Sequence, residues 1–206
     1  MGAAKPATPQ TRAVRKLVYS MMVSLDGFIE TPERSLDWVV IDEELHRFAN
    51  DAARATGAFL YGRRLYEVMA AYWPTPEART SDLSYIRDFA RIWAETPKVV
   101  FSRTLDAVSW NSRLVRDDVR DEIVRLKQEP GDELAIGGPR LAGTALRLGL
   151  IDEYRPIVHP VVLGSGTPFL PPLESRINLR LLETHRFGSG VVYLRYEDAD
   201  ARVRQA

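Results

Sequence analysis

The chain has 206 residues, of which 45% are hydrophobic and 27% are charged, a composition typical of a globular protein with a substantial buried core. Its 28 basic and 28 acidic residues balance, so its charge favours neither nucleic acid nor an anionic membrane as a partner. The absence of cysteine excludes disulfides, thiolate nucleophiles and cysteine-bound metal. Because the three histidines are widely separated, we predict no metal site; they are His46, His159 and His185.

The N-terminal segment, residues 1–13, is rich in alanine, proline and threonine and lacks the apolar run of a signal peptide. We therefore predict a disordered tail on a cytoplasmic protein. No stretch of the chain approaches the roughly 18 consecutive apolar residues of a membrane helix. We find no internal repeat and no linker, so residues 14–200 are predicted to form a single domain.

The first long element, residues 15–25, is nearly continuous apolar sequence that ends at Asp26-Gly27, as in a central strand covered on both faces. Apolar residues at helical spacing follow over residues 42–55, with acidic residues in the first turn. Further helices are predicted over residues 63–71, 83–93 and 119–128, with a loop over 74–80. Further strands are predicted over residues 58–61, 98–101, 110–115, 134–136 and 154–163.

At the C-terminus, residues 178–187 and 191–197 flank Gly188-Ser189-Gly190, which is the pattern of a β-hairpin. The strands before this hairpin alternate with helices, which is typical of a parallel sheet with helices on both faces. We therefore predict an α/β fold with three layers, αβα, and a mostly parallel central sheet that ends in an antiparallel hairpin.

The segment Glu133–Gly149 contains a short strand, a Gly137-Gly138 turn and a helix opened by Pro139, a residue suited to the first helical position. Two glycines allow a ligand to approach the backbone closely, and a helix start offers free N–H groups and a positive dipole end. Arg140 adds a cation there. These features suit a phosphate group, although a tight turn without a ligand has the same pattern.

Three predicted strands end in a cation accompanied by glycine or a small hydroxyl residue. The three loops are Gly62-Arg63-Arg64, Ser102-Arg103-Thr104 and Gly137-Gly138-Pro139-Arg140-Leu141. Ligands of parallel sheets bind at the carboxyl ends of the strands, so these loops indicate a polyanionic ligand, most simply a dinucleotide pyrophosphate. A second cation near the ribose would favour NADP over NAD.

Six motifs extend this pattern: Ser24–Ile29, Leu60–Glu67, Lys98–Leu105, Ile136–Leu141, Gly149–Tyr154 and Pro160–Phe169. In this order, across about residues 15–197, the chain resembles the dihydrofolate reductase fold. Within that fold it is similar to stand-alone relatives of the C-terminal reductase domain of riboflavin biosynthesis. The resemblance implies that the three strand-end loops hold NADPH. The residues with which the riboflavin enzyme binds its ribose-phosphate substrate are not recognisable here.

The resemblance also suggests two carboxylates as proton donors. Glu44 matches the acidic residue that folate reduction uses on the first helix, with Glu43 in the neighbouring register. Asp26 resembles the Asp-Gly of the riboflavin reductase domain. A desolvated carboxyl group beside the nicotinamide should have a raised pKa. The alternatives are an exposed acid at a helix start for Glu44 and a turn residue for Asp26.

A flat substrate could bind against an aromatic wall of Trp38, Phe48 and Tyr66, each of which could equally be a core residue. We predict an NADPH-dependent reductase that transfers hydride to a small conjugated heterocycle, pterin-like or pyrimidine-like. The alternatives are a non-catalytic dinucleotide-binding protein acting as a sensor or scaffold, and an α/β domain whose arginine loops bind phosphate adventitiously. The riboflavin-type relatives imply a homodimer, and the apolar, proline-containing segment 154–169 suggests an open sheet edge for its interface.

Overall fold

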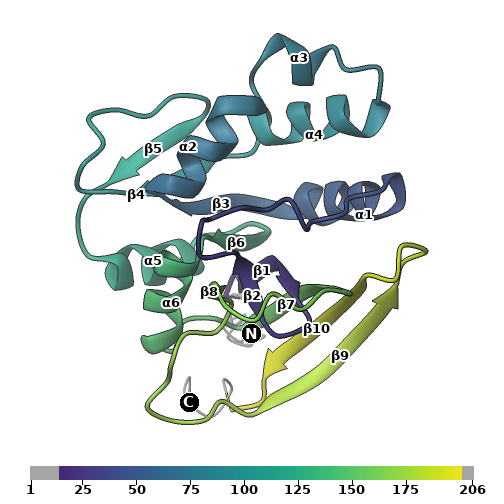
Figure 1. Ribbon diagram of the computed structural model, residues 1–206. Helices are drawn as coiled ribbons and strands as arrows, with labels where there is room; N and C mark the ends of the chain where they lie inside the picture. Colours follow the sequence, from purple (N-terminus) through teal and green to yellow (C-terminus); the bar gives the residue numbers. More distant parts are fainter. Residues whose placement is uncertain (1–13, 201–206) are drawn as a thin grey trace, which may run out of the picture.

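The computed structural model describes residues 14–200, and its centre is a single eight-stranded sheet (Figure 1). The strands are β1 (Leu17–Ser24), β3 (Thr56–Gly62), β4 (Lys98–Phe101), β5 (Ser112–Val115), β6 (Glu133–Gly137), β7 (Glu153–His159), β9 (Leu179–Arg186) and β10 (Val192–Asp198). Their spatial order is β5-β4-β3-β6-β1-β7-β10-β9. The strands from β5 to β7 are parallel, and β10 and β9 are antiparallel. The predicted mostly parallel sheet with a C-terminal hairpin is confirmed.

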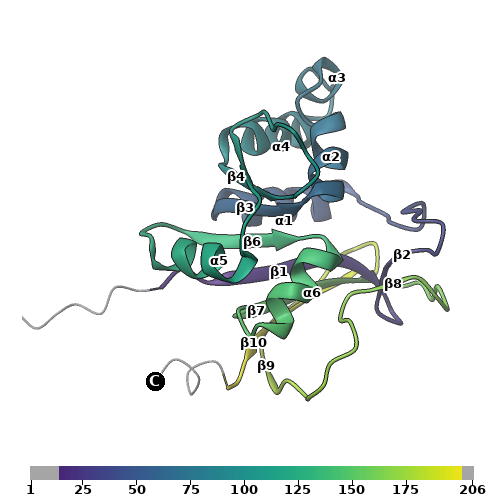
Figure 2. The same cartoon turned by 90° about the vertical axis from the view of Figure 1, so that its left-hand side faces the viewer.

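Helices cover both faces of this sheet, as the three-layer prediction requires. The helices are α1 (Glu43–Arg54), α2 (Arg63–Tyr72), α3 (Pro76–Arg79), α4 (Ser84–Glu95), α5 (Val119–Gln128) and α6 (Pro139–Arg147). Figure 2 looks onto α5 and α6, whose apolar side chains pack with β1, β3 and β6 in one core. On the opposite face, α2 and α4 pack on β3 and β4, and α1 packs on β7 and β10.

The segment over residues 74–80, predicted as a loop, contains the one-turn helix α3. The Thr75 hydroxyl accepts a hydrogen bond from the Ala78 amide, and Pro76 occupies the first helical position. Both are local signals for a helix start. The loop prediction was therefore wrong at a place where the sequence itself carries the helix signal.

The strand predicted over residues 154–163 ends at His159, and its place in the sheet differs from the prediction. One side of β7 pairs with β1 from Val18↔Glu153 to Ser24↔His159, and the other side pairs with β10. The prediction of an open edge at residues 154–169 is wrong. The edge strand on this side is β9, and all eight of its residues are exposed. The homodimer stays a prediction, and its interface cannot be an open edge of β7.

A second, two-stranded sheet was not predicted. It pairs β2 (Phe28–Glu30) antiparallel with β8 (Thr167–Pro168) beside the ends of β1 and β7. Gly166 precedes β8 at φ +150°, and a Cβ atom there would lie 2.0 Å from the Glu30 carbonyl oxygen. Only glycine therefore allows the two chain segments to approach this closely.

Across residues 14–200, no helix is long and apolar enough to cross a membrane. The same part of the chain holds no group of three histidine, aspartate or glutamate side chains arranged to bind a metal ion. The tail predicted over residues 1–13 lies outside the described residues.

Candidate functional site

Strand register places the three predicted loops side by side at the carboxyl edge of the sheet. Tyr61 of β3 is opposite Gly137 of β6, and Gly62 is opposite Phe101 of β4. The loops that follow these strands therefore begin at one level. This arrangement is the geometry in which α/β sheets bind ligands.

Two helices begin at this edge with unsatisfied N-termini. The N-cap residues of α2 and α6 are Gly62 and Gly138, which provide no side-chain cap, and neither helix has an acidic residue in its first turn. By contrast, the aspartates Asp42 and Asp118 cap α1 and α5 with their carboxylates. The first N–H groups of α2 and α6 are thus available to an anion, as phosphate sites require.

The two glycines of the Gly137-Gly138 turn have different physical roles. Gly138 adopts φ +88°, a left-handed conformation that favours glycine. A Cβ atom on Gly137 would lie 2.5 Å from Cδ2 of Leu65, so this glycine lets β6 and the start of α2 pack together. Pro139 follows at the first helical position of α6, and Leu141 is buried in the core below it. The turn itself is buried against Leu65, and the chain reaches the surface at Pro139 and Arg140, which begin α6.

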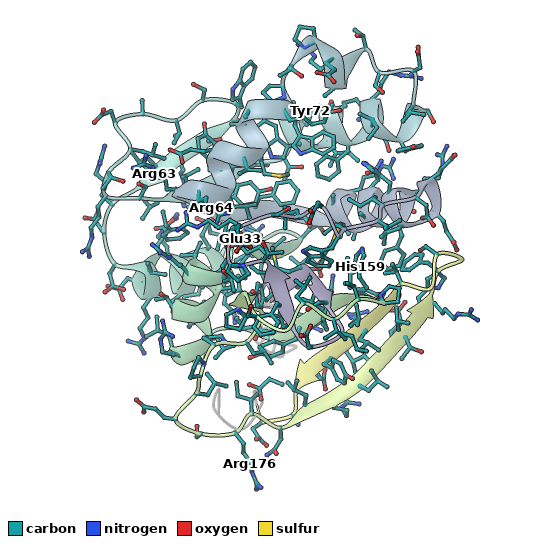
Figure 3. All side chains as sticks on the ribbon, viewed as in Figure 1. Glu33, Arg63, Arg64, Tyr72, His159 and Arg176 are labelled. Carbon is teal, nitrogen blue, oxygen red and sulfur yellow. The ribbon has the colours of Figure 1, made fainter. Side chains whose placement is uncertain are left out.

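The arginines of the three loops differ in whether their guanidinium groups bind other side chains of the protein. Arg63 donates to Glu67 at 2.8 Å and to the Thr104 hydroxyl at 2.9 Å, which links the first two loops. Figure 3 shows Arg63 and Arg64 on the same side of the molecule, at the start of α2. Among the described residues, the side chains of Arg103 and Arg140 have no hydrogen-bonding or ionic partner.

Arg64 has a structural role that the sequence did not indicate. It binds the Glu30 carboxylate with two hydrogen bonds of 2.9 and 2.7 Å, and the Thr167 hydroxyl donates to the same carboxylate at 2.7 Å. Burial of Glu30 would raise its pKa, but these hydrogen bonds and the Arg64 charge outweigh it, so the pKa is lowered. Arg64 therefore fixes α2 to β2 and β8.

The hydroxyl of Ser102 organises the second loop by accepting hydrogen bonds from the backbone amides of Thr104 and Leu105, at 3.2 and 3.1 Å. The next residue, Arg103, accepts a hydrogen bond at its backbone carbonyl oxygen from the Arg116 side chain. The loop is thus held by backbone contacts while the Arg103 guanidinium remains unpaired among the described residues.

Asp26 does not have the environment of a proton donor. Its carboxylate accepts a hydrogen bond from the Ser24 hydroxyl at 2.6 Å and from the amides of Leu163 and Gly164, at 3.1 and 2.7 Å. These bonds, with Ser24 contributing most, lower the pKa of Asp26. The expectation of a raised pKa is therefore wrong for Asp26, which holds the turn after β1 against the loop after β7.

Glu44 lies at the start of α1 and is directed at the C-terminal hairpin. Its carboxylate accepts a hydrogen bond from the Gly188 amide at 2.9 Å and lies 3.8 Å from the His185 ring nitrogen. Its neighbour Glu43 pairs with Arg47 on the exposed side of the helix. Glu44 thus connects α1 to the turn between β9 and β10.

A cavity of ≈ 210 Å³ lies between the sheet and the layer of α1, α2 and α4. Gly137 and Leu65 line it where it reaches the strand-end loops, and Phe48 contributes to it from α1. Phe48 is the one predicted aromatic that lines this cavity. Tyr66 is buried and exchanges hydrogen bonds with the backbone of Ser109, whereas Trp38 packs edge-to-face on His159. Neither Asp26 nor Glu44 is among the lining residues.

The cavity is also lined by polar residues that were not predicted: Ser20, Thr56, Tyr61, Glu133, Arg155 and Tyr193. Arg155 binds Glu133 through two hydrogen bonds of 2.6 and 2.7 Å and also contacts the fully buried Glu153. A sequence signal was available, because charged residues alternate through the otherwise apolar strand β7. Charges at such positions are seldom buried unless they are paired.

The chain is similar in sequence to known proteins of one family. A model of the family described as "RibD C-terminal domain" matches residues 15–193. The chain is 33% identical over 183 residues to the uncharacterized protein YyaP of Bacillus subtilis strain 168, covering 88% of this chain and 94% of YyaP.

Solved structures show the same fold. A putative riboflavin biosynthesis protein from Shewanella sp. PV-4 has a TM-score of 0.67 at 22% identity, covering 88% of this chain and 98% of the other. A dihydrofolate reductase from Enterococcus faecalis, complexed with NADP(H), has a TM-score of 0.60 at 13% identity, covering 90% and 97%. The predicted dihydrofolate reductase-like fold is confirmed.

Proposed function

The chain belongs to the RibD C-terminal domain family, whose relatives include reductases, and from this premise we propose that it is an NADPH-dependent reductase. Its substrate would be a small conjugated heterocycle, pterin-like or pyrimidine-like. One observation supports this most strongly. At the carboxyl edge of the sheet, beside the Gly137 and Leu65 that line the cavity, two helices start at glycine caps, and Arg103 and Arg140 have no partner within residues 14–200.

The residues of this edge fit a dinucleotide diphosphate. The amides at the starts of α2 and α6 would donate to the pyrophosphate oxygens, since no side chain in the described part of the chain caps them. Arg103 and Arg140 would bind further phosphate oxygens, and the second of these charges is what favours NADPH over NADH. When bound, NADPH supplies the hydride of the reaction.

The protein itself would position the substrate ring and exclude water from the cavity. The apolar walls of the cavity, from Phe48 on α1 to Ile157 on β7, would hold a flat ring against the sheet. Because Asp26 and Glu44 are bound elsewhere, the proton would come from water or from a hydroxyl group on the cavity wall. This placement of the carboxylates also supports the second candidate, a dinucleotide-binding protein without catalysis.

Calorimetric titration with NADPH and NADH tests the proposal. Arg103→Ala should weaken NADPH binding by about 1.5–3 kcal/mol, the range for hydrogen bonds to a charged group. Arg176→Ala is the matched control, because Arg176 lies far from Arg63 and the start of α2 at the other end of the molecule (Figure 3). Equal affinity of wild type and Arg103→Ala, or no NADPH binding, would contradict the proposed site. Oxidation of NADPH with a bound heterocycle separates a reductase from a non-catalytic protein.

A further inference from the structure

The cavity beneath α1 has the size and lining of a site for a small uncharged molecule. Its volume is ≈ 210 Å³, and α1 contributes Phe48, Ala49 and Ala52 to its wall. The opposite wall consists largely of apolar strand residues such as Val18 and Ile157. A dry cavity of about 150 Å³ accommodates benzene in another protein, so this space suits a molecule of one or two rings.

The cation on the cavity wall is not available to a phosphate. Arg155 donates through Nε to Glu153 at 3.0 Å, and its two terminal nitrogens bind the carboxylates of Glu133 and Glu153 at 2.6–2.7 Å. Its side chain is only 11% exposed. A phosphate ester in this space would lose its hydration without gaining a free cation, and it would approach the negative charge of Glu133. The arginines that have no partner among residues 14–200, Arg103 and Arg140, belong to the strand-end loops instead.

Among the described residues, two hydroxyl groups on the wall have no acceptor within the protein, those of Tyr61 and Tyr193. Ser20 and Thr56 donate to the carbonyl oxygens of Arg155 and Ala52, at 2.9 and 3.1 Å, and the Tyr61 hydroxyl lies next to Trp93. Tyr193 lines the cavity from β10 and is 6% exposed, and its hydroxyl has no hydrogen-bond partner among the described residues. Its ring packs against Phe48 with centroids 4.8 Å apart, which fixes its direction.

A tyrosine hydroxyl with its ordinary pKa of about 10 is a donor at neutral pH, and burial raises the pKa of Tyr193 further. The Tyr193 hydroxyl keeps some access to solvent, so water can satisfy it in the empty cavity, and a ligand that displaces this water must supply an acceptor in its place. A compound without an acceptor at that point would leave the donor unsatisfied. The hydroxyl therefore discriminates between ligands of similar shape.

We propose that the substrate is an uncharged ring compound with a conjugated carbonyl group, and that the Tyr193 hydroxyl donates a hydrogen bond to its oxygen. Addition of a hydride to such a conjugated system places negative charge on this oxygen, where a fixed donor stabilises it. This assignment deepens the proposed reductase function and rests on it. Tyr193 is a specificity-determining residue in this scheme, and the phosphate-bearing pyrimidine class is excluded from the cavity.

Calorimetry on the protein without NADPH tests the assignment with lumazine, an uncharged two-ring dione. Wild type should bind lumazine, and Tyr193→Phe should weaken this binding about 3- to 10-fold, as expected for one hydrogen bond. The control is Tyr196→Phe, because Tyr196 lies on the same strand but packs against the core on the other face of the sheet. This variant should bind lumazine as wild type does, and circular dichroism should show both variants folded.

Three results would overturn the proposal: no lumazine binding by wild type, equal binding by Tyr193→Phe, or tighter binding of uridine 5′-monophosphate than of lumazine. A separate titration with NADPH distinguishes failure of the ligand assignment from failure of the proposed reductase function. If lumazine binding depends on Tyr193 while NADPH does not bind, the reductase proposal fails and the ligand assignment holds. If NADPH binds and Tyr193→Phe leaves lumazine binding unchanged, only the ligand assignment fails.

Discussion

The two ends of the parallel strands are both rich in charge, but their charges have different surroundings. At the amino ends, the buried carboxylate of Glu153 accepts hydrogen bonds from Lys16, Arg155 and Arg195 at 2.6–3.0 Å. At the carboxyl ends, Arg103 and Arg140 have no partner among the described residues, and α2 and α6 lack side-chain caps. Charges that the chain satisfies itself hold the sheet together, and groups that it leaves unsatisfied are available to a ligand.

The largest effect is expected from Glu153→Gln at the amino end. This substitution removes a fully buried charge that pairs with the buried Arg155 and with the more exposed Lys16 and Arg195, so stability should fall by about 3–5 kcal/mol. Urea denaturation measures this loss. Glu197→Gln is the matched control on β10, because Glu197 pairs with the exposed Arg180 and its loss should cost less than about 1 kcal/mol. If both variants bind NADPH as wild type does, the amino end stabilises the fold without contributing to the ligand site. Equal losses of stability in Glu153→Gln and Glu197→Gln would contradict the role given to Glu153.

The same carboxylate predicts a loss of stability in acid. Burial alone would raise the pKa of Glu153, but the hydrogen bonds from Arg195, Lys16 and Arg155 lower it to about 2. The unfolded chain therefore takes up a proton at a higher pH than the folded protein does. The stabilisation is present above the unfolded pKa of about 4.3 and decreases as pH falls toward 2. Glu153→Gln should lack this part of the acid dependence.

Lys98 is a buried cation at the amino end of the sheet that is bound by carbonyl oxygens instead of a carboxylate. It begins β4, is 1% exposed, and donates to the carbonyl oxygens of Thr96 and Trp93. Burial lowers the pKa of Lys98 to about 8. Between pH 8 and about 10.4 the unfolded chain holds a proton that the folded protein has released, so stability should rise with pH by up to about 3 kcal/mol.

Comparison with Lys98→Met isolates this contribution, because methionine fills similar space without a charge. Urea denaturation of both proteins at pH 7.5 and pH 10 should show the stability difference shifting in favour of wild type at the higher pH. A difference that does not change with pH would mean that Lys98 keeps its proton through this range.

The smallest effects are expected from the two predicted proton donors. Asp26→Asn and Glu44→Gln alter loop contacts outside the cavity, so hydride transfer to a bound heterocycle should stay within about threefold of wild type. General acid catalysis contributes typically 10²–10⁴-fold, so a true donor would show a far larger loss. Steady-state NADPH oxidation with lumazine measures this, and a 10²-fold decrease in either variant would restore that carboxylate to the site.

Patterns that depend on neighbouring residues could be predicted from the sequence. The apolar run before Asp26-Gly27 became β1, and the Gly137-Gly138 turn joined β6 to α6 with Pro139 at the first helical position. Apolar runs and turn residues determine secondary structure locally, and the order of elements then limits the topology.

Contacts between distant residues could not be predicted in this way. Arg64 was assigned to a phosphate because its partner, Glu30, lies 34 residues away, and nothing near Arg64 in the sequence indicates the pairing. Tyr193 was read only as part of a hairpin, because its position in the cavity depends on α1 crossing over β10. A titratable residue is thus visible in the sequence, whereas its partner is a property of the fold.

The position of β1 between β6 and β7 affects how the protein emerges during synthesis. Leu17 pairs with Leu134, and Val18 pairs with Glu153, so the first strand has no sheet neighbours until more than half of the chain has been made. Such long-range pairing slows folding, because a long loop must close before any contact forms. The cavity is completed only when Tyr193 arrives. A nascent chain therefore exposes an apolar strand for most of translation, and a slow ribosome would prolong that exposure.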